Sequence, residues 1–214
     1  MFFGESLNRN VLLILIMCLT VFSSCYLNAQ VYDKESDFLT VPSGNGKSYY
    51  ILKYCGLKQG NIIVPRYINK KPVTGISQSA FADLELYSVN IPKGIKKIED
   101  WSFSGNFFSD FQIPKSVTEI GAGAFMTNRI TGITIPKSVR NIGYRAFCDN
   151  PISSVTIGKN VALDSISGYD DELDREWRYV AFELGCDVEF DDFYRQGGSK
   201  AGTYILKDGV WSIK

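Results

Sequence analysis

The 214-residue sequence contains no histidine, and this absence removes a large part of enzyme chemistry. Ser-His-Asp and Cys-His nucleophile pairs need an imidazole, as do histidine-ligated metal centres. Lysine, carboxylate and tyrosine chemistries remain open. We therefore expect a non-enzymatic protein with no cofactor and no metal, and keep a carboxylate-based enzyme as a minor alternative.

The sequence also lacks an excess of charge of either sign. Its 23 Lys and Arg residues balance 23 Asp and Glu residues, so the formal net charge is zero. Binding to nucleic acid draws on a basic surplus that neutralises phosphates. The composition therefore predicts no nucleic-acid partner.

No apolar run in the sequence is long enough to cross a membrane as a helix. The run "VLLILIMCLTVF" at 11–22 is shorter than the roughly 20 residues that a bilayer requires. It follows Arg9 and precedes small residues, which is typical of an export signal. Cleavage after Ala29 remains open, and so does a lipoprotein signal in which "VFSSC" leads to lipidation of Cys25. Both alternatives predict an extracytoplasmic protein, which is secreted or lies at the cell surface or outer membrane. Its only predicted link to a membrane is the lipid that the second alternative attaches to Cys25.

Three cysteines lie beyond both processing sites, at Cys55, Cys148 and Cys186. In an oxidising compartment, an odd set permits one disulfide and one free thiol, and the sequence does not select the pair. Small buried free cysteines are the alternative.

What the sequence has in abundance is repetition at a step of 22 residues: "IPKSVTEIGAGAF" begins at Ile113 and "IPKSVRNIGYRAF" at Ile135. The main columns in register are Phe81, Phe103, Phe125 and Phe147; Ile76, Ile98, Ile120 and Ile142; Val89, Phe111, Ile133 and Val155; and Asn106, Asn128 and Asn150. One unit cannot bury these residues alone, so we expect stacked coils that bury them against their own copies. The front segment of each unit, such as 130–135, is predicted to be a short strand closed by proline, and the following segment to turn the chain.

Each unit reads "I..I.IP..V..IG..AF..N", which resembles the BspA-like, Treponema pallidum-type leucine-rich repeat over about residues 50–165. The resemblance implies an α/β-type repeat solenoid that is mainly β: a right-handed leucine-rich repeat superhelix of about five coils. The corresponding organisation is a signal (1–29), an N-terminal segment and β cap (30–60), repeats (61–165) and a C-terminal cap of a helix and a β-hairpin (166–214).

The ends of the repeat array predict its caps. The alternating segment 48–65 turns at Gly56 and Gly60, which suggests a hairpin-like N-terminal cap. The segment "YDDELDREWRYVAFELG" at 169–185 has apolar residues at helical spacing and predicts an amphipathic helix. The tail predicts a hairpin around Asp208-Gly209. In "DVEFDD" at 187–192, the acids Asp187, Glu189 and Asp191 share one face of a predicted strand. The segment lacks an EF-hand glycine, so a solvated acidic edge is favoured over a calcium site.

Three sets of residues are candidate binding residues. Leucine-rich repeats generally bind on the outward strip of their sheet, which predicts a strip at Ser88, Asn90, Asp110, Gln112, Gly132, Thr134, Ser154 and Thr156. Exposed anchors on the turns are predicted at Trp101, Phe107, Tyr144 and Arg145. A basic ridge is predicted at Lys93, Lys115, Lys137 and Lys159, either for an anionic partner or as protection of strand edges.

Binding specificity should depend on the residues that differ between neighbouring units, because the residues that the units share build the core. In the two units quoted above, these are Thr118, Glu119, Ala122 and Gly123 against Arg140, Asn141, Tyr144 and Arg145. The resemblance implies adhesion or contact with host proteins. We expect a protein or glycan ligand, with a structural envelope lipoprotein that has no soluble ligand as the alternative.

Overall fold

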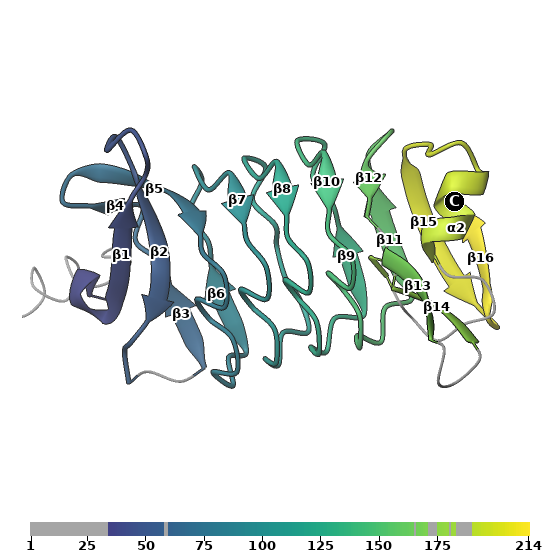
Figure 1. The fold of residues 1–214 in the computed structure, drawn as a ribbon, viewed down its shortest axis with the longest axis horizontal. Coiled ribbons are helices and arrows are strands. Elements are labelled where there is room, and N and C mark those ends of the chain that lie inside the picture. Colours follow the sequence, from purple (N-terminus) through teal and green to yellow (C-terminus); the bar gives the residue numbers. More distant parts are fainter. Residues whose placement is uncertain (1–33, 58–59, 165, 171–174, 180, 183–189) are drawn as a thin grey trace, which may run out of the picture. The chain divides into compact units, whose positions relative to one another are not determined.

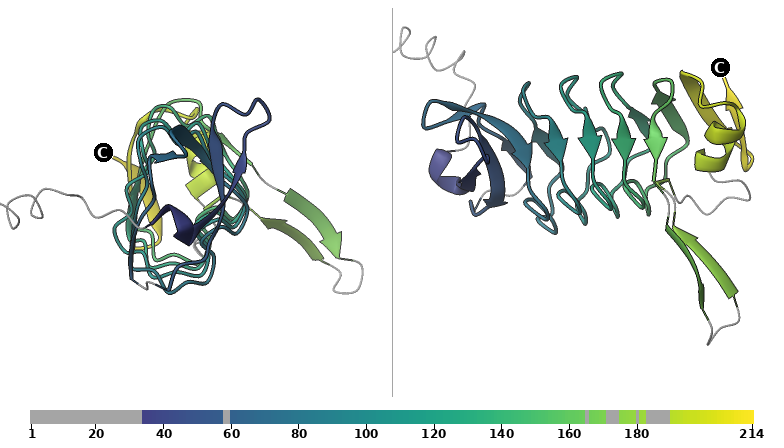
Figure 2. Two further views of the ribbon diagram at one scale, coloured as in Figure 1. Left: turned by 90° about the vertical axis from the view of Figure 1, so that its left-hand side faces the viewer. Right: turned by 45° about the horizontal axis from the view of Figure 1, so that its top comes forward.

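The computed structural model describes residues 34–57, 60–164, 166–170, 175–179, 181–182 and 190–214. They form a mainly β solenoid of about five turns, with its coils in succession along the chain (Figures 1 and 2). This architecture confirms the predicted repeat solenoid. The predicted export signal, with Cys25, lies outside the described residues, as does Cys186.

One side of every coil contributes to an eight-stranded sheet, the long sheet, with the order β1-β2-β5-β7-β8-β10-β12 and β4 paired to β5. Its strands are β1 (Phe38–Pro42), β2 (Tyr49–Tyr54), β4 (Tyr67–Ile68), β5 (Lys71–Ile76), β7 (Lys97–Ile98), β8 (Glu119–Ile120), β10 (Asn141–Ile142) and β12 (Ala162–Leu163). Along β2-β5-β7-β8-β10-β12 the strands are parallel, while β4 is antiparallel to β5; Ile98, Ile120 and Ile142 pair in register. The segment that the sequence predicted only to turn the chain therefore builds the most continuous sheet.

The front segments form two shorter sheets. The first pairs β3 (Asn61–Ile63) with β6 (Ser88–Asn90), and the second has the order β16-β15-β11-β9, with β9 (Gly132–Thr134), β11 (Ser154–Ile157), β15 (Gly202–Lys207) and β16 (Val210–Ile213). Between them, residues 110–112 form no strand, contrary to the prediction for this segment. This coil carries Phe111 where its neighbours carry valine or isoleucine. The ring packs 4.6 Å from that of Phe125, and the larger side chain needs space that a flush strand pairing would not leave.

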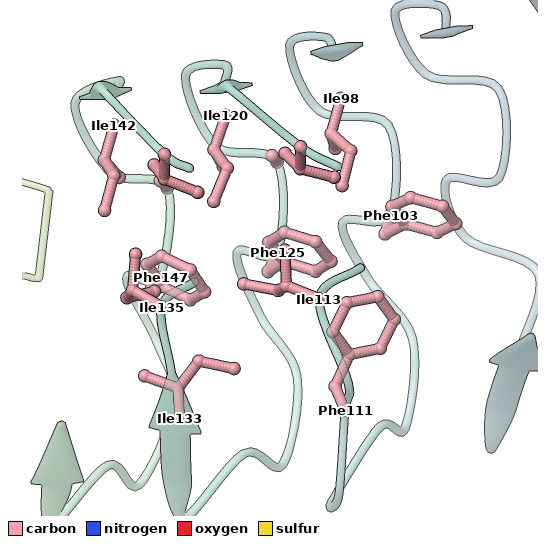
Figure 3. Packing of buried hydrophobic residues seen from close by; sticks show 14 of the residues in the cluster. Ile98, Phe103, Phe111, Ile113, Ile120, Phe125, Ile133, Ile135, Ile142 and Phe147 are labelled. Carbon is pink, nitrogen blue, oxygen red and sulfur yellow. The ribbon is translucent and has the colours of Figure 1, made fainter. Parts of the chain in front are cut away.

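The core consists of the predicted ladders, and Figure 3 shows the isoleucines and phenylalanines of successive coils pointing into it. The rings of Phe81, Phe103, Phe125 and Phe147 are fully buried and stacked, with centroids 5.1, 5.5 and 5.4 Å apart. Interplanar angles of 6° to 12° keep the rings nearly parallel. Each coil thus buries the apolar face of the next.

A second ladder, of asparagines, satisfies the backbone at the corner of each coil. The side-chain nitrogen of Asn128 donates to the carbonyl oxygens of Phe103, in the preceding coil, and of Phe125, in its own. Its side-chain oxygen accepts from the N–H of Phe108 at 3.1 Å. Asn106 and Asn150 make the same bonds one coil away. All three are buried, so the column serves the backbone and not a ligand.

The last coil contains an insertion that hides its repeat. The N–H of Phe147 donates to the carbonyl of Ala181, as the N–H of Phe125 donates to that of Ala146, and the ring of Phe182 stacks on Phe147 at 4.7 Å. Ala181 and Phe182 are therefore the Ala-Phe pair of one further coil. In the sequence, residues 165–180 therefore correspond to only Tyr144 and Arg145 of the preceding coil.

The inserted segment contains the antiparallel strands β13 (Ile166–Asp170) and β14 (Arg175–Tyr179), which form a separate two-stranded sheet (Figure 2). The helix predicted for 169–185 is wrong, because 175–179 are a strand. Pairing with the preceding strand overrides helical spacing here. Of the positions used to predict that helix, Leu173, Val180 and Leu184 lie outside the described residues.

The C-terminal cap contains the helix α2 (Phe190–Gln196) and the β15–β16 hairpin, whose predicted turn at Asp208-Gly209 is confirmed. Asp191 was predicted on a strand with a solvated edge, but it lies in α2 and is completely buried. Its carboxylate accepts from the N–H of Ala181 at 2.8 Å and of Phe182 at 3.0 Å. It therefore caps the last coil; Asp187 and Glu189 lie outside the described residues.

The N-terminal cap begins with a 3-10 turn, η1 (Glu35–Asp37), followed by the antiparallel pair β1–β2. A hairpin across Gly56 and Gly60 was predicted, but β2 and β3 belong to different sheets. The reason is that β2 already pairs in parallel with β5 in the long sheet, while β3 pairs with β6.

Candidate binding surfaces

A groove of about 600 Å³ follows the outer side of the long sheet. We call it the acidic groove; its polar lining consists chiefly of Lys97, Glu99, Asp100, Glu119, Asn141, Tyr144 and Asp164. Its charged lining residues are thus four carboxylates and one lysine.

Strand geometry places these side chains in the groove. On β7, β8 and β10, Lys97, Glu119 and Asn141 are in register and alternate with the buried isoleucines that follow them. Successive residues of a strand point to opposite faces, so the polar residue of each pair faces outward. Glu119, Asn141 and Tyr144 are among the letters that differ between units, which is the signal in the sequence for this groove. It was not predicted as a site because its segment was not expected to form a sheet.

The charges of the groove are partly paired within the protein. The Lys97 ammonium lies 2.6 Å from the carboxylate of Glu119, and this hydrogen bond, with the negative charge, raises the pKa of Lys97. Asp100 accepts from the N–H of Ala122 at 2.8 Å, and Glu99 from the N–H of Gln78 at 3.3 Å. The donors in these two contacts are uncharged backbone N–H groups, so the lining still has more acidic than basic side chains.

A second groove, of about 750 Å³, lies along the front sheet β9–β11–β15. We call it the threonine–lysine groove; its polar side chains are Lys115, Lys137, Lys214, Thr134, Thr156, Thr203 and Ser138. It brings together two members of the predicted strip and two of the predicted ridge. Thr203 and Lys214 come from the C-terminal hairpin and were missed, since nothing in the sequence indicated that β15 would pair with β11.

The rest of the predicted strip does not form one surface with these residues. Ser88 and Asn90 lie on β6, in the other front sheet, and the hydroxyl of Ser88 donates to Asn61 at 2.8 Å. Asp110 and Gln112 are exposed in the segment without a strand. Ser154 is half-buried, on a strand flanked by β9 and β15.

The predicted turn anchors are all half-buried, and their surroundings differ. Tyr144 lines the acidic groove, while Trp101 lies against Gly123, where a Cβ would come within 2.5 Å of the indole. Arg145 donates to the sulfur of Cys148 at 3.7 Å. Phe107 packs between Tyr87, at 5.4 Å between ring centroids, and the guanidinium of Arg129, at 4.2 Å. Of the predicted ridge, Lys93 and Lys159 are exposed but do not line the threonine–lysine groove.

Cysteine and metal chemistry contribute little to these surfaces. Cys55 is exposed and Cys148 is buried, and the two do not form a disulfide with each other. In the described part of the chain, no group of three or more His, Cys, Asp or Glu residues could hold a metal ion. No helix within the described ranges is long and apolar enough to span a bilayer.

These coils, ladders and outward polar faces define a leucine-rich repeat solenoid. The family model for the BspA type leucine-rich repeat region matches residues 48–168 in six copies, and the chain belongs to this family. No curated protein matches the chain significantly.

Among solved structures, the leucine-rich repeat protein TpLRR of T. pallidum is 19% identical, with a TM-score of 0.50 over 60% of this chain and 74% of its own. A leucine-rich repeat protein of Bacteroides ovatus is 21% identical over 60% of this chain and 41% of its own, with a TM-score of 0.43. A leucine-rich cell surface protein of Faecalibacterium prausnitzii is 15% identical over 68% and 60%, with a TM-score of 0.29. The likeness to TpLRR supports the fold.

Proposed function

We propose that the chain is an exported, non-enzymatic bacterial surface protein that binds a protein ligand through the acidic groove. Repeat proteins of this family are typically binding proteins, and members are typically exported or surface-attached. The observation that carries the proposal is the groove itself: a continuous rigid sheet with outward polar residues that the ladders of the core do not require.

The chemistry of the groove favours a cationic segment of the partner. Four carboxylates against one lysine attract Lys and Arg side chains, and Asn141 supplies both a donor and an acceptor. Tyr144 adds an aromatic surface with a polar tip, which is the kind of residue that contributes most at protein interfaces. The long axis of the groove crosses several coils, so an extended segment fits it better than a compact one.

The experiment is a selection of short random peptides on the purified protein, compared with the variant Glu99→Gln/Asp164→Asn. We expect peptides enriched in Lys and Arg, with affinity lowered about tenfold in the variant. The matched control, Asp83→Asn/Glu85→Gln, removes two exposed carboxylates outside the groove and should bind as the unaltered protein does. Selection of uncharged peptides, or equal losses in both variants, would overturn the proposal.

The location is tested separately by the intact mass of the protein recovered from its own cells. A diacylglyceryl mass on Cys25 identifies an anchored lipoprotein, and a mature chain that starts at Gln30 identifies a freely exported one. An unprocessed Met1 would contradict export. A lipidated protein that selects no peptide would favour the structural envelope role instead.

A further inference from the structure

We infer that the threonine–lysine groove is a second binding site, for a sulfated polysaccharide. This site is distinct from the acidic groove, because it lies along β9, β11 and β15 and shares no lining residue with it. The inference does not depend on the protein ligand proposed above.

The first argument is charge. Three lysines, Lys115, Lys137 and Lys214, line the groove, and its lining includes no Asp or Glu side chain. None of the three has an ion-pair partner among the described residues. The formal net charge of zero therefore conceals a local basic site, opposite in sign to the acidic groove. Ammonium groups that the fold leaves unpaired attract anionic groups of a ligand.

The second argument is a row of hydroxyl groups across the sheet. In the strand register, Thr134 on β9 is paired with Thr156 on β11, and Thr156 with Thr203 on β15. Neighbouring strands lie roughly 4.8 Å apart, so the three threonines follow one another directly across the sheet. The Thr156 and Thr203 hydroxyl oxygens are 2.9 Å apart and share a hydrogen bond, which fixes their rotamers. A fixed row of donors and acceptors matches the hydroxyl and sulfate oxygens of a sugar chain.

The third argument is shape. Gly158 and Ala201 leave part of the lining without bulky side chains, and the atoms nearest to a Cβ on Gly158 would be 3.8 Å away, so a ligand ring can approach the backbone there. The ridge continues along the coils on both sides of the groove, with exposed Lys93 before it and Lys159 after it in the repeat. A linear polymer with regularly repeated sulfates fits such an array better than a single small anion does.

The lining also argues against nucleic acid as the polyanion. Single strands are held by bases stacked on aromatic side chains, and the lining contains no aromatic residue. Duplex DNA presents phosphates but no saturated ring hydroxyls to a threonine row. We therefore make DNA a competitor in the test.

The experiment measures binding of the purified protein to immobilised heparin across a salt series. The variant Lys115→Gln/Lys137→Gln should bind at least about tenfold more weakly, and its slope of log affinity against log salt should fall by about two, one for each lost contact. The variant Thr134→Val keeps the charge and shape while removing one hydroxyl, and should weaken binding about threefold. The matched control, Lys47→Gln/Lys53→Gln, changes two exposed lysines of the N-terminal cap and should stay within about twofold.

Three outcomes would overturn the inference: equal losses in the test and control lysine variants, equal binding to the desulfated polysaccharide, or competition by duplex DNA as strong as that by free heparin. The substituted lysines are exposed, so the variants should be as stable as the unaltered protein. An unchanged melting temperature verifies that they are folded. The acidic-groove variant should bind heparin as the unaltered protein does. A failure of this site is thereby separated from a failure of the proposed protein-binding function.

Discussion

The middle coils and the C-terminal end of the solenoid both bury apolar side chains and satisfy backbone hydrogen bonds, but they do so with different residues. Between Phe81 and Asn150, each ring is covered by an identical ring and each corner amide bonds to the same carbonyls one coil away. At the end, Asp191 replaces the next coil by accepting two backbone N–H bonds, and β15 replaces it by pairing antiparallel with β11. A repeat can serve as its own template, whereas a cap must be assembled from residues that occur once.

The largest expected effect concerns the middle coils, in which each phenylalanine stacks on its copies in the neighbouring coils. Phe125→Ala should lower the free energy of unfolding by about 3–5 kcal/mol, because the ring is fully buried and stacks on both neighbours. Urea unfolding followed by circular dichroism measures the change. The control Phe107→Ala removes a half-buried surface ring and should cost less than about 1 kcal/mol. Equal costs would mean that the ladder is not the principal source of stability.

The next effect concerns the cap. Asp191→Asn keeps the shape but removes the charge that receives the N–H groups of Ala181 and Phe182, and should destabilise the protein by about 1.5–3 kcal/mol. Hydrogen exchange should locate the loss in the last coil. The neighbouring substitution Asp192→Asn affects a more exposed carboxylate, 3.7 Å from Arg195, and should cost less than about 1 kcal/mol. Exchange that rises evenly in all coils would argue against a capping role.

A smaller effect distinguishes two glycines at the joints between coils. A Cβ on Gly143 would lie 2.4 Å from the backbone nitrogen of Ala122, so Gly143→Ala should cost about 1–3 kcal/mol by forcing the coils apart. Gly158 directly follows the last regular front strand, β11, and there the nearest atom to a Cβ is 3.8 Å away. Gly158→Ala should therefore leave the melting temperature unchanged or slightly raise it. The opposite order would show that backbone contact does not set the spacing of the coils.

The smallest expected effect is a dependence on alkaline pH that is confined to the cap. Burial raises the pKa of Tyr194 above its ordinary value of 10.0, and burial with the nearby Tyr194 raises that of Tyr204. A folded-state pKa above the unfolded one means that the folded protein retains the proton longer. The resulting stability is present below pH 10 and is lost as the pH rises through the folded-state pKa values. Tyr204→Phe should make the decline above pH 10 shallower in urea titrations, and an unchanged decline would exclude Tyr204 as a source.

These contrasts also explain which parts of the molecule the sequence could predict. The ladders were predictable because each column repeats the same residue type at the same step, as with Phe103 and Phe125. The acidic groove was only partly predictable. The sequence shows which of its residues vary between units, but the strands that carry them are two residues long, too short to give an alternating pattern. The cap was not predictable, because the contact between Asp191 and Ala181 depends on a chain path that no local pattern encodes.

The insertion at residues 165–180 has a consequence for how the protein can acquire new surface. Closing a loop costs entropy that grows only with the logarithm of its length, about 0.6 kcal/mol for each doubling. Lengthening the path from Phe147 to its stacking partner Phe182 therefore costs little compared with the contact that is kept. The corner before each Ala-Phe pair is consequently a place where segments can be added or exchanged almost without thermodynamic penalty.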